Sequence, residues 1–430
     1  MSAKILSRTD KTFKVEVEIS YTESMLEFEG VIQTAVNEVG QVATQEALTT
    51  FDADGSPIMV GDTKLTSKGQ ESKTYQTPFG GVAVERHVYQ GSKGGKTHVP
   101  LESKARIILT STPKFAQMVS SKYADLGSSR VQSDLAENHG RSLARRAIQD
   151  ISEAVSAVVE AKESTWTYAS PELKSEVTSV AIGMDGTCLL MCEDGYREAM
   201  VGTIALYDKD GERLHTSYMA ASPEHGKERF LSKFSHEIEQ VKARYGEDPT
   251  YIGLADGAKC NWAFLTEHTD RQTIDFWHVT EYLSKAANAL FSKKSQVAEK
   301  NTWMEKACHQ LKHKVGGASR ILREMEDGLA SCQKITKVLK EGLEAAITYF
   351  RHNQSKMAYV KNVKENLPIG SGVTEAACKV IVKQRLCGSS MKWKESGASV
   401  VLRLRCMNYT TGKWTQFWNK VNQYGLSAVA

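Results

Sequence analysis

The chain has 430 residues, of which 41% are hydrophobic and 25% are charged, and its formal net charge is +4. This length favours two or three domains, and the composition is typical of a globular protein rather than a disordered one. No run of about 18 apolar residues occurs, so the sequence predicts no membrane-spanning segment. The first residues lack the apolar core of a signal peptide, and we expect a cytoplasmic protein.

The eight cysteines are scattered, and no Cys-x-x-Cys pair occurs among them. Cys188 and Cys192 lie four residues apart on a predicted strand, which is a weak zinc signal without a second such pair. We therefore expect all eight to be reduced thiols, as in a cytosolic protein.

Charge is distributed unevenly along the chain. Residues 1–292 carry 31 Lys and Arg against 41 Asp and Glu, a balance of −10, whereas residues 293–430 carry 24 against 10, a balance of +14. A basic half is typical of a protein that binds a polyanion such as nucleic acid. A solvated, lysine-rich helical region would have the same composition, so charge alone leaves both interpretations open.

Residues 1–110 are predicted to form an α+β region. Alternating polarity indicates a strand over 11–20, and apolar residues at steps of three and four indicate a helix over 22–51. Paired glycines at 80–81 and 94–95 predict two β-hairpins.

Residues 111–170 are predicted to be helical. Within them a helix ends near Gly140, and Ser142 is placed to cap a second helix that carries Arg141, Arg145 and Arg146. This outline resembles a helix-turn-helix whose second helix contacts DNA. A plain helical hairpin with a basic surface is an equally good interpretation.

Residues 176–291 alternate between strand and helix patterns. The predicted order is strands 177–191, 198–207 and 211–219, helix 223–245, strand 251–255, a helix from Ala258, strand 272–277 and helix 279–291. This is the α/β order of a ribonuclease H-like core, in which the first and fourth strands are neighbours. Asp185 and Asp256 would then lie side by side.

Residues 292–366 lack strand patterns and are predicted to form a helical insertion. It precedes region 367–430, which begins with a turn containing Pro368, Gly370 and Gly372. The helix that follows carries Glu375 near its first turn, where a negative charge is favourable. We predict that the helix carrying Glu375 folds back onto the sheet.

Three carboxylates in one groove, Asp185, Asp256 and Glu375, would require cations to offset their mutual repulsion. Oxygen ligands without thiols favour Mg²⁺, with Mn²⁺ as a substitute, and two ions would bind both oxygens of a phosphodiester displacement. Each residue also has an ordinary explanation as a turn or a helix cap, so the prediction depends on their coming together.

The chain turns basic after Glu375, since nine Lys and Arg stand against one acid between residues 376 and 430. Arg and Lys interleaved with Trp suit phosphate neutralisation and base stacking. Core packing by tryptophan and solvation of lysine would explain the same pattern. The residues predicted to contact DNA are Lys379, Lys383, Arg385, Lys392, Trp393, Arg403 and Arg405.

Several motifs resemble the DDE transposases of bacterial insertion sequences, in particular the ISKra group. They are Gly-Met-Asp-Gly-Thr at 183–187, Gly-Leu-Ala-Asp-Gly-Ala at 253–258, Pro-Ile-Gly-Ser-Gly at 368–372 and Glu375-Ala-Ala-Cys-Lys. The resemblance extends over about residues 78–420. The Asp275-x-x-His278 segment also resembles a signature of Mutator-type transposases. The chain departs from the family at Cys387, where a basic residue is usual, and at Ser390, where glycine is usual.

The resemblance implies a metal-dependent transposase with catalytic carboxylates Asp185, Asp256 and Glu375, and His278 as a possible auxiliary residue. Its partners would be the terminal inverted repeats of a transposon and the target DNA, bound by a homodimer or larger assembly at the nucleoid. Two alternatives remain: a catalytically silent DNA-binding protein derived from a transposase, and a non-transposing nuclease of the same fold.

Overall fold

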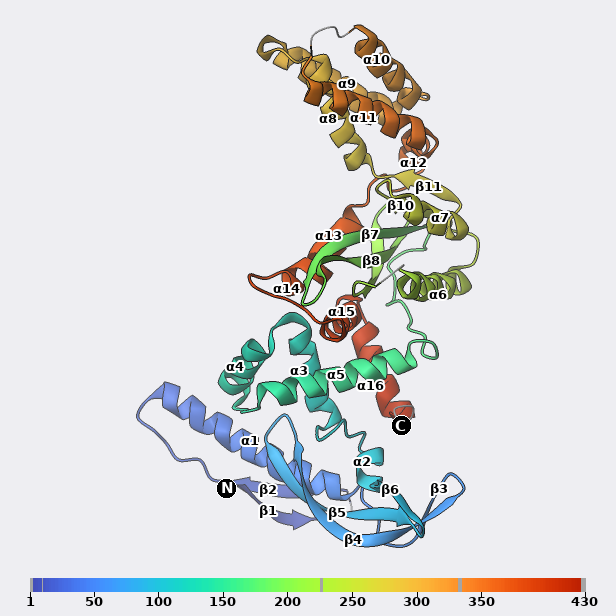
Figure 1. The fold of residues 1–430 in the computed structure, drawn as a ribbon. Helices are drawn as coiled ribbons and strands as arrows, with labels where there is room; N and C mark the ends of the chain where they lie inside the picture. Colours follow the sequence, from blue (N-terminus) through green and yellow to red (C-terminus); the bar gives the residue numbers. More distant parts are fainter. Residues whose placement is uncertain (1–2, 10, 225–226, 332–334, 427–430) are drawn as a thin grey trace. The chain divides into compact units, whose positions relative to one another are not determined.

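The computed structural model describes residues 3–9, 11–224, 227–331 and 335–426 (Figure 1). The chain forms two compact units. Unit 1 comprises Met1–Tyr168, Arg403–Asn408 and Lys413–Ala430, and unit 2 comprises Ala169–Leu402 and Tyr409–Gly412. None of the described helices combines the length and the apolar character that crossing a bilayer requires.

Unit 1 begins with an α+β region, as predicted. An antiparallel pair, β1 (Ala3–Arg8) and β2 (Phe13–Val17), precedes the long helix α1 (Met25–Thr49). An antiparallel sheet follows, with strands in the order β3 (Ile58–Val60), β4 (Thr63–Gln76), β5 (Gly81–Gly91) and β6 (Gly94–His98). Val82 and Val84 of β5 are buried against Leu48 of α1, because alternate residues of a strand point to the same side.

The helices of unit 1 are α2 (Pro100–Lys104), α3 (Pro113–Asp125), α4 (Ser128–His139), α5 (Arg145–Lys162) and α16 (Lys413–Tyr424). Gly140 ends α4 in a left-handed conformation, as expected for a helix C-terminus. The next helix does not begin at Ser142, however. Ala144 is the residue before its first turn, and no side chain caps it.

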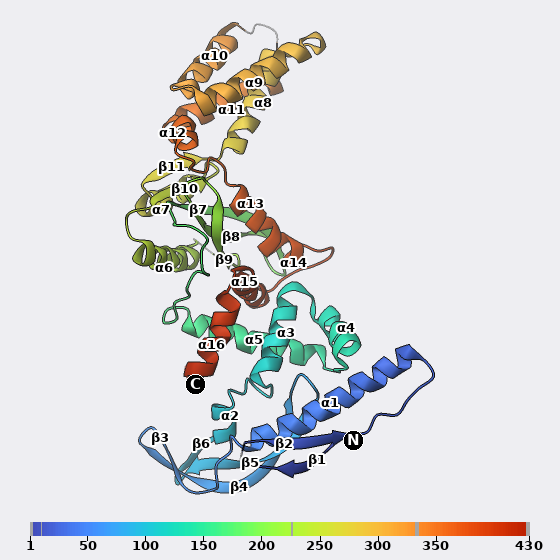
Figure 2. The same cartoon turned by 180° about the vertical axis from the view of Figure 1, so that it is seen from behind.

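Unit 2 contains a mixed five-stranded sheet with strands β7 (Ser179–Met191), β8 (Gly195–Tyr207), β9 (Arg213–Ala221), β10 (Thr250–Ala255) and β11 (Arg271–Ile274). Their order across the sheet is β11-β10-β7-β8-β9 (Figure 2). The first three strands form an antiparallel meander, and β10 and β11 run parallel to β7. The first and fourth strands of the unit are therefore neighbours, as the order of elements predicted.

The two sides of this sheet have different coverings. Val180, Ile182 and Met184 of β7 share one side and belong to the main core with α6 (Glu228–Tyr245) and α7 (Lys259–His268). Residues 181, 183 and 185 point to the other side, because side chains alternate along a strand. There Ala181 and Leu254 form a smaller core against Leu367 and Val373.

Strand β11 ends at Ile274, earlier than the predicted end at 277, and Asp275 instead caps helix α8 (Phe276–Leu290). The reason is local, since the Asp275 carboxylate accepts the backbone N–H of His278 at 2.9 Å and so starts the helix. The predicted helix 223–245 likewise begins later, at Glu228, and residues 225–226 lie outside the described part of the chain.

The helical insertion consists of α9 (Val297–His313), α10 (Gly317–Ser331), α11 (Lys337–Asn353) and α12 (Tyr359–Lys364), with short 3₁₀ turns at Lys294–Gln296 and Gln354–Lys356. Figure 2 shows α9, α10 and α11 packed beside α8. Leu311, Ile321 and Leu343 are fully or almost fully buried in the same core as the sheet. The insertion is thus part of unit 2.

The chain then returns to the sheet as α13 (Gly372–Ala377), a π-helical turn (Cys378–Lys383) and α14 (Gln384–Leu386). Helix α15 (Glu395–Tyr409) follows, and its residues 403–408 belong to unit 1. The predicted region 367–430 is therefore divided between the two units.

Candidate active site

Asp185 and Asp256 lie at the same level of two adjacent strands. Leu254 of β10 pairs with Gly183 of β7 in parallel register, and two further residues along each strand give Asp256 and Asp185. Asp256 follows the last residue of β10, where its Oδ1 accepts the backbone N–H groups of Gly257 at 2.7 Å and Ala258 at 3.1 Å. These bonds hold the carboxylate at the carboxyl end of the strand.

Burial raises the pKa of the Asp185 carboxyl above its ordinary value, and the nearby charge of Asp256 raises it further. The N–H of Gly186, which donates to Oδ1 at 2.7 Å, acts in the opposite direction. So do the Cys378 thiol, 3.6 Å from Oδ2, and the charge of His278. Asp185 is therefore a carboxylate whose ionised form is insufficiently compensated by the protein alone.

Glu375 reaches this side of the sheet because α13 packs directly on β7. A Cβ atom at Gly183 would lie 2.1 Å from Oγ1 of Thr374, so the contact requires glycine at this position. The Thr374 hydroxyl is in turn 2.7 Å from that of Thr203 on β8, in a buried hydrogen bond. Thr374, the residue before Glu375, therefore packs on Gly183. Gly183 precedes Asp185 by two residues and faces the same side of β7.

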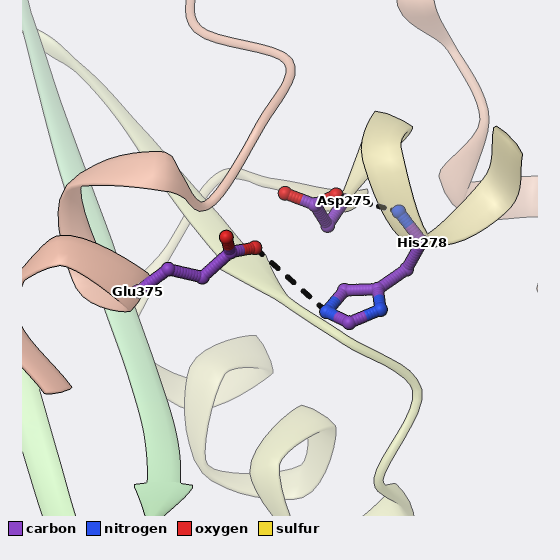
Figure 3. Close-up of side chains that lie close together, drawn as sticks. All are labelled: Asp275, His278 and Glu375. Atoms are coloured by element: carbon purple, nitrogen blue, oxygen red, sulfur yellow. Dashed lines mark hydrogen bonds and ion pairs between the residues drawn. The ribbon is translucent and has the colours of Figure 1, made fainter. Parts of the chain in front are cut away.

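Glu375 lies next to the first turn of α8. Its Oε1 is 3.8 Å from Nε2 of His278, as Figure 3 shows. One ligand atom from each of Asp275, His278 and Glu375 lies within 4.8 Å of the others, so this group could hold a metal ion. Elsewhere in the described chain no group of three His, Cys, Asp or Glu meets this criterion, and the set Asp185, Asp256 and Glu375 does not.

Asp275 is less available to a metal than its position suggests. It is fully buried, and its Oδ1 accepts the N–H of His278. Its Oδ2 accepts both the backbone N–H of Ser371 and the Ser371 hydroxyl, the latter at 2.7 Å. With three donors on one carboxylate, Asp275 acts as an anchor between α8 and the loop before α13.

The three predicted carboxylates retain more capacity to bind a cation. Asp185 Oδ2 contacts only a thiol, and the second oxygens of Asp256 and Glu375 have no hydrogen-bond partner within the described ranges. Hard oxygen ligands with free lone pairs are what Mg²⁺ requires. Two ions about 4 Å apart would also not need all three carboxylates within one coordination sphere. The free oxygens of these carboxylates therefore have the chemistry of ligands for a hard divalent cation.

Two features beside the site were not predicted from sequence as parts of it. Ser371 joins Asp275 to the Glu375 loop, a contact between residues 96 apart that no local sequence pattern signals. Tyr349 of α11 stacks on Tyr282 with ring centres 3.8 Å apart. Burial raises its pKa, as do the charges of Asp256 and Asp275, and its hydroxyl has no hydrogen-bond partner among the described residues.

The structure separates the residues predicted to bind DNA into two groups. Lys379, Lys383 and Lys392 of unit 2 are exposed, as are Arg145 and Arg146 of unit 1. Arg146 forms an ion pair with Asp150 at 2.7 Å. Lys379 and Lys383 lie on the π-helical turn, not on a regular α-helix as expected; such turns are often found at functional sites.

The predicted DNA contacts of Arg141 and Arg405 are incorrect, because both side chains are buried and bonded within the protein. Arg141 is 6% exposed, and its guanidinium donates to the Thr77 carbonyl at 3.0 Å and to the Gln76 side chain at 2.8 Å. Arg405 is 2% exposed and pairs with Asp125 at 2.5 Å.

Arg385 is buried in the same way, whereas Arg403 and Trp393 are partly buried and make contacts within the protein. Arg403 pairs with Glu160 at 2.7 Å and donates to the Ser156 hydroxyl. Arg385 is 5% exposed and its guanidinium lies 5.3 Å from the centre of the Trp393 ring. The Trp393 backbone N–H donates to the Leu190 carbonyl, and its indole N–H donates to that of Leu386, so Trp393 holds the chain against the end of β7.

Seven of the eight cysteines are free thiols in the structure, and Cys332 lies outside the described residues. Burial raises the pKa of Cys378, and the charge of Asp185 raises it further, so its thiol remains protonated beside that carboxylate. Neither a protein-family model nor a curated protein matches this chain.

Proposed function

We propose that this protein is a metal-dependent DNA transposase of the DDE type with a ribonuclease H-like core. One observation carries the proposal: α13 brings Glu375, from beyond a helical insertion, to the side of the sheet where Asp185, in the middle of β7, lies beside Asp256, which follows the end of β10. The sheet order and the resemblance of the motifs around these three residues support it.

Asp185, Asp256 and Glu375 would together hold Mg²⁺. When bound, such ions supply charge neutralisation at the phosphodiester and a water or 3′ hydroxyl that is easier to deprotonate. The protein orients the ligands: Gly257 and Ala258 amides hold Asp256, and the Asp275–Ser371 contact holds the Glu375 loop. His278, 3.8 Å from Glu375, is placed to orient that carboxylate.

In this proposal the substrates are transposon ends and target DNA. Hydrolysis by water would break a phosphodiester at the transposon end and free a 3′ hydroxyl. That hydroxyl would attack a phosphodiester of the target DNA, join to its phosphorus and release a target 3′ hydroxyl, without a covalent enzyme intermediate. The exposed lysines of the π-helical turn, Lys379 and Lys383, lie beyond Glu375 and would contact the DNA backbone.

A cleavage assay on supercoiled plasmid that carries the reading frame with its flanking DNA tests the proposal. Glu375→Gln keeps the size of the side chain but removes a metal ligand, and we expect strand cleavage in Mg²⁺ to be lost. Glu247→Gln is the control, because Glu247 is an exposed carboxylate outside the candidate site. It should cut like the unmodified protein.

Binding must be measured in the same preparations, since lost cleavage with lost folding would not be informative. We expect Glu375→Gln to retain DNA in a gel shift and to unfold at the same denaturant concentration. Cleavage by Glu375→Gln at the unmodified rate would contradict the proposal.

A further inference from the structure

A pocket of about 410 Å³ lies in the helical insertion, away from the carboxylates. It is formed by the end of α9, the connection 314–316, the first turn of α10, and the segment that enters α12. All of these elements belong to unit 2. We call it the basic pocket, for the three lysines in its lining: Lys314, Lys361 and Lys364.

The local sequence explains why a hollow persists here. A Cβ atom at Gly317 would lie 2.3 Å from the carbonyl oxygen of Gln310, so only glycine lets α10 begin this close to α9. On the other side, the Gln354 amide donates to the Ser319 hydroxyl and joins the two walls. Leu311, Ala318 and Met357 contribute buried apolar surface to the lining. The pocket is therefore a built concavity with an apolar interior.

The charge of its lysines is uncompensated. Lys314, Lys361 and Lys364 are exposed, and none has an ion-pair partner among the residues that the structure describes. Other lysines of the insertion do have such partners: Lys306 with Glu324, Lys337 with Glu341, and Lys340 with Glu344. Three unpaired cations around an apolar hollow favour a ligand that is itself both anionic and apolar.

The basic pocket is joined to the active-site elements by its own walls. In α12, the Tyr359 hydroxyl donates to the Ile274 carbonyl at 2.9 Å and the Asn362 amide to the Thr273 hydroxyl at 2.7 Å. In α9, the ammonium of Lys312 lies 4.4 Å from the ring centre of Phe276. All three contacts end within two residues of Asp275, so the elements around the pocket and the candidate site are anchored at the same end of β11.

We propose that the basic pocket binds one nucleotide of a DNA strand, with the base or sugar on the apolar lining and the phosphates among the three lysines. The inference deepens the proposed function and rests on it for the identity of the polyanion as DNA. Residues 292–366 carry 15 Lys and Arg against 8 Asp and Glu, which suits a strand passing over the insertion. A DNA strand bound in this pocket would be held in a fixed position relative to the end of β11 and the start of α8.

The test measures binding of a short fluorescent DNA duplex with a single-stranded tail to the full chain at several salt concentrations. The pocket variant replaces Lys314, Lys361 and Lys364 with Gln, and the control variant replaces Lys306, Lys337 and Lys340 with Gln. We expect the pocket variant to bind at least tenfold more weakly, with a salt slope smaller by about 0.7–0.9 for each lost phosphate contact. The control should keep the slope of the unmodified protein.

A second variant separates a nucleotide in the pocket from a general basic field. Ala358→Trp fills the pocket from an exposed position without changing charge. We expect it to weaken binding to a similar extent as the lysine variant but to leave the salt slope nearly unchanged. Unmodified affinity in Ala358→Trp, or an unmodified slope in the lysine variant, would overturn the inference. Binding of free deoxyadenosine monophosphate at the pocket with DNA affinity unaffected by either variant would also overturn it.

Cleavage of the plasmid substrate by the unmodified protein is measured in parallel. If that cleavage occurs and the pocket variants bind DNA normally, the pocket inference fails and the proposed function stands. If the pocket variants lose DNA binding but the unmodified protein never cuts, the proposed function fails and the pocket remains a DNA site.

Discussion

Asp275 and Ser371, 96 residues apart in the chain, are joined by two hydrogen bonds to a single carboxylate oxygen. Both residues are buried, and the backbone N–H of Phe276 adds a third bond to the Ile369 carbonyl at 3.0 Å. The start of α8 and the loop before α13 are thereby held together. Because Glu375 lies four residues after Ser371, this contact determines where the third carboxylate is presented.

Replacing Ser371 with Ala should destabilise unit 2 by about 2 kcal/mol, since it removes a hydrogen bond to a buried carboxylate. It should also weaken Mg²⁺ binding, because the Glu375 loop loses its anchor. Urea unfolding and a Mg²⁺ titration measure the two effects. Ser396→Ala, on the exposed surface of α15, should change stability by less than about 0.5 kcal/mol. Equal stability of both variants would show that the contact is unimportant.

Gly183→Ala should displace α13, because the added Cβ would meet the Thr374 hydroxyl. We expect a loss of about 1–3 kcal/mol, as for other overpacked positions. Removing that hydroxyl in the double variant with Thr374→Ala should make the combined loss smaller than the sum of the single losses. Gly372→Ala is the control, since nothing lies within 4 Å of its added Cβ. Strict additivity in urea unfolding would argue against the contact.

Asp185→Asn should stabilise the metal-free protein at neutral pH. The folded-state pKa of Asp185 is raised, so between its ordinary and its raised value the folded state holds a proton that the unfolded state has released. Stability therefore falls as pH rises through that window, and a tenfold difference in proton affinity between the two states corresponds to about 1.4 kcal/mol. Thermal melts should show a gain of a few degrees at pH 7 that disappears below the ordinary pKa of Asp.

With Mg²⁺ added, the unmodified protein should become more stable than Asp185→Asn, because the ion binds the ionised carboxylate and stabilises the folded state. Asp185→Asn should gain less from added Mg²⁺. The exposed Asp248→Asn is the control and should respond to Mg²⁺ like the unmodified protein. A Mg²⁺ response of Asp185→Asn equal to that of the control would exclude Asp185 as a ligand.

Substitution of the exposed lysines should change DNA binding, whereas substitution of the buried Arg405 should change stability. Replacing the exposed Lys379, Lys383 and Lys392 with Gln should lower the salt slope of DNA binding by up to about 0.9 per residue, with stability nearly unchanged. Arg405→Ala should instead cost about 2–5 kcal/mol of stability, because it empties a buried volume and removes the hydrogen bond to the Ala124 carbonyl. An unchanged slope for the lysine variant would remove these residues from the DNA surface.

Ser390 has a positive φ of 62°, a conformation that favours glycine, and glycine is the residue usual in the resembling family at this position. Ser390→Gly should stabilise the protein by up to about 1 kcal/mol, since the relief of strain exceeds the added chain entropy. Ser389→Gly, at the neighbouring exposed position, lacks the positive φ and should be neutral or destabilising. The urea concentrations at the midpoints of unfolding of the two variants are compared with that of the unmodified protein.

The elements of unit 2 were predictable because their signals are local. Alternating polarity marked β7 and β8, helical spacing marked α6, and the order of elements predicted that β7 and β10 are neighbours. Strand β1 was missed because it is short and mostly exposed, and its apolar residues do not alternate regularly with polar ones. Residues 275–277 were assigned to a strand because alternation extends across them, whereas the side chain of Asp275 starts a helix.

Sequence by itself therefore determined most strands and helices, and the candidates Asp185, Asp256 and Glu375, because periodicity and turn chemistry depend on neighbours in the chain. Tertiary structure alone decided which charges reach solvent. Arg141 and Arg405 resemble Lys379 in sequence, but each is buried against a partner from another part of the chain. It also decided that Glu375 lies beside His278, because the Asp275–Ser371 contact closes a loop of 96 residues that no local pattern records.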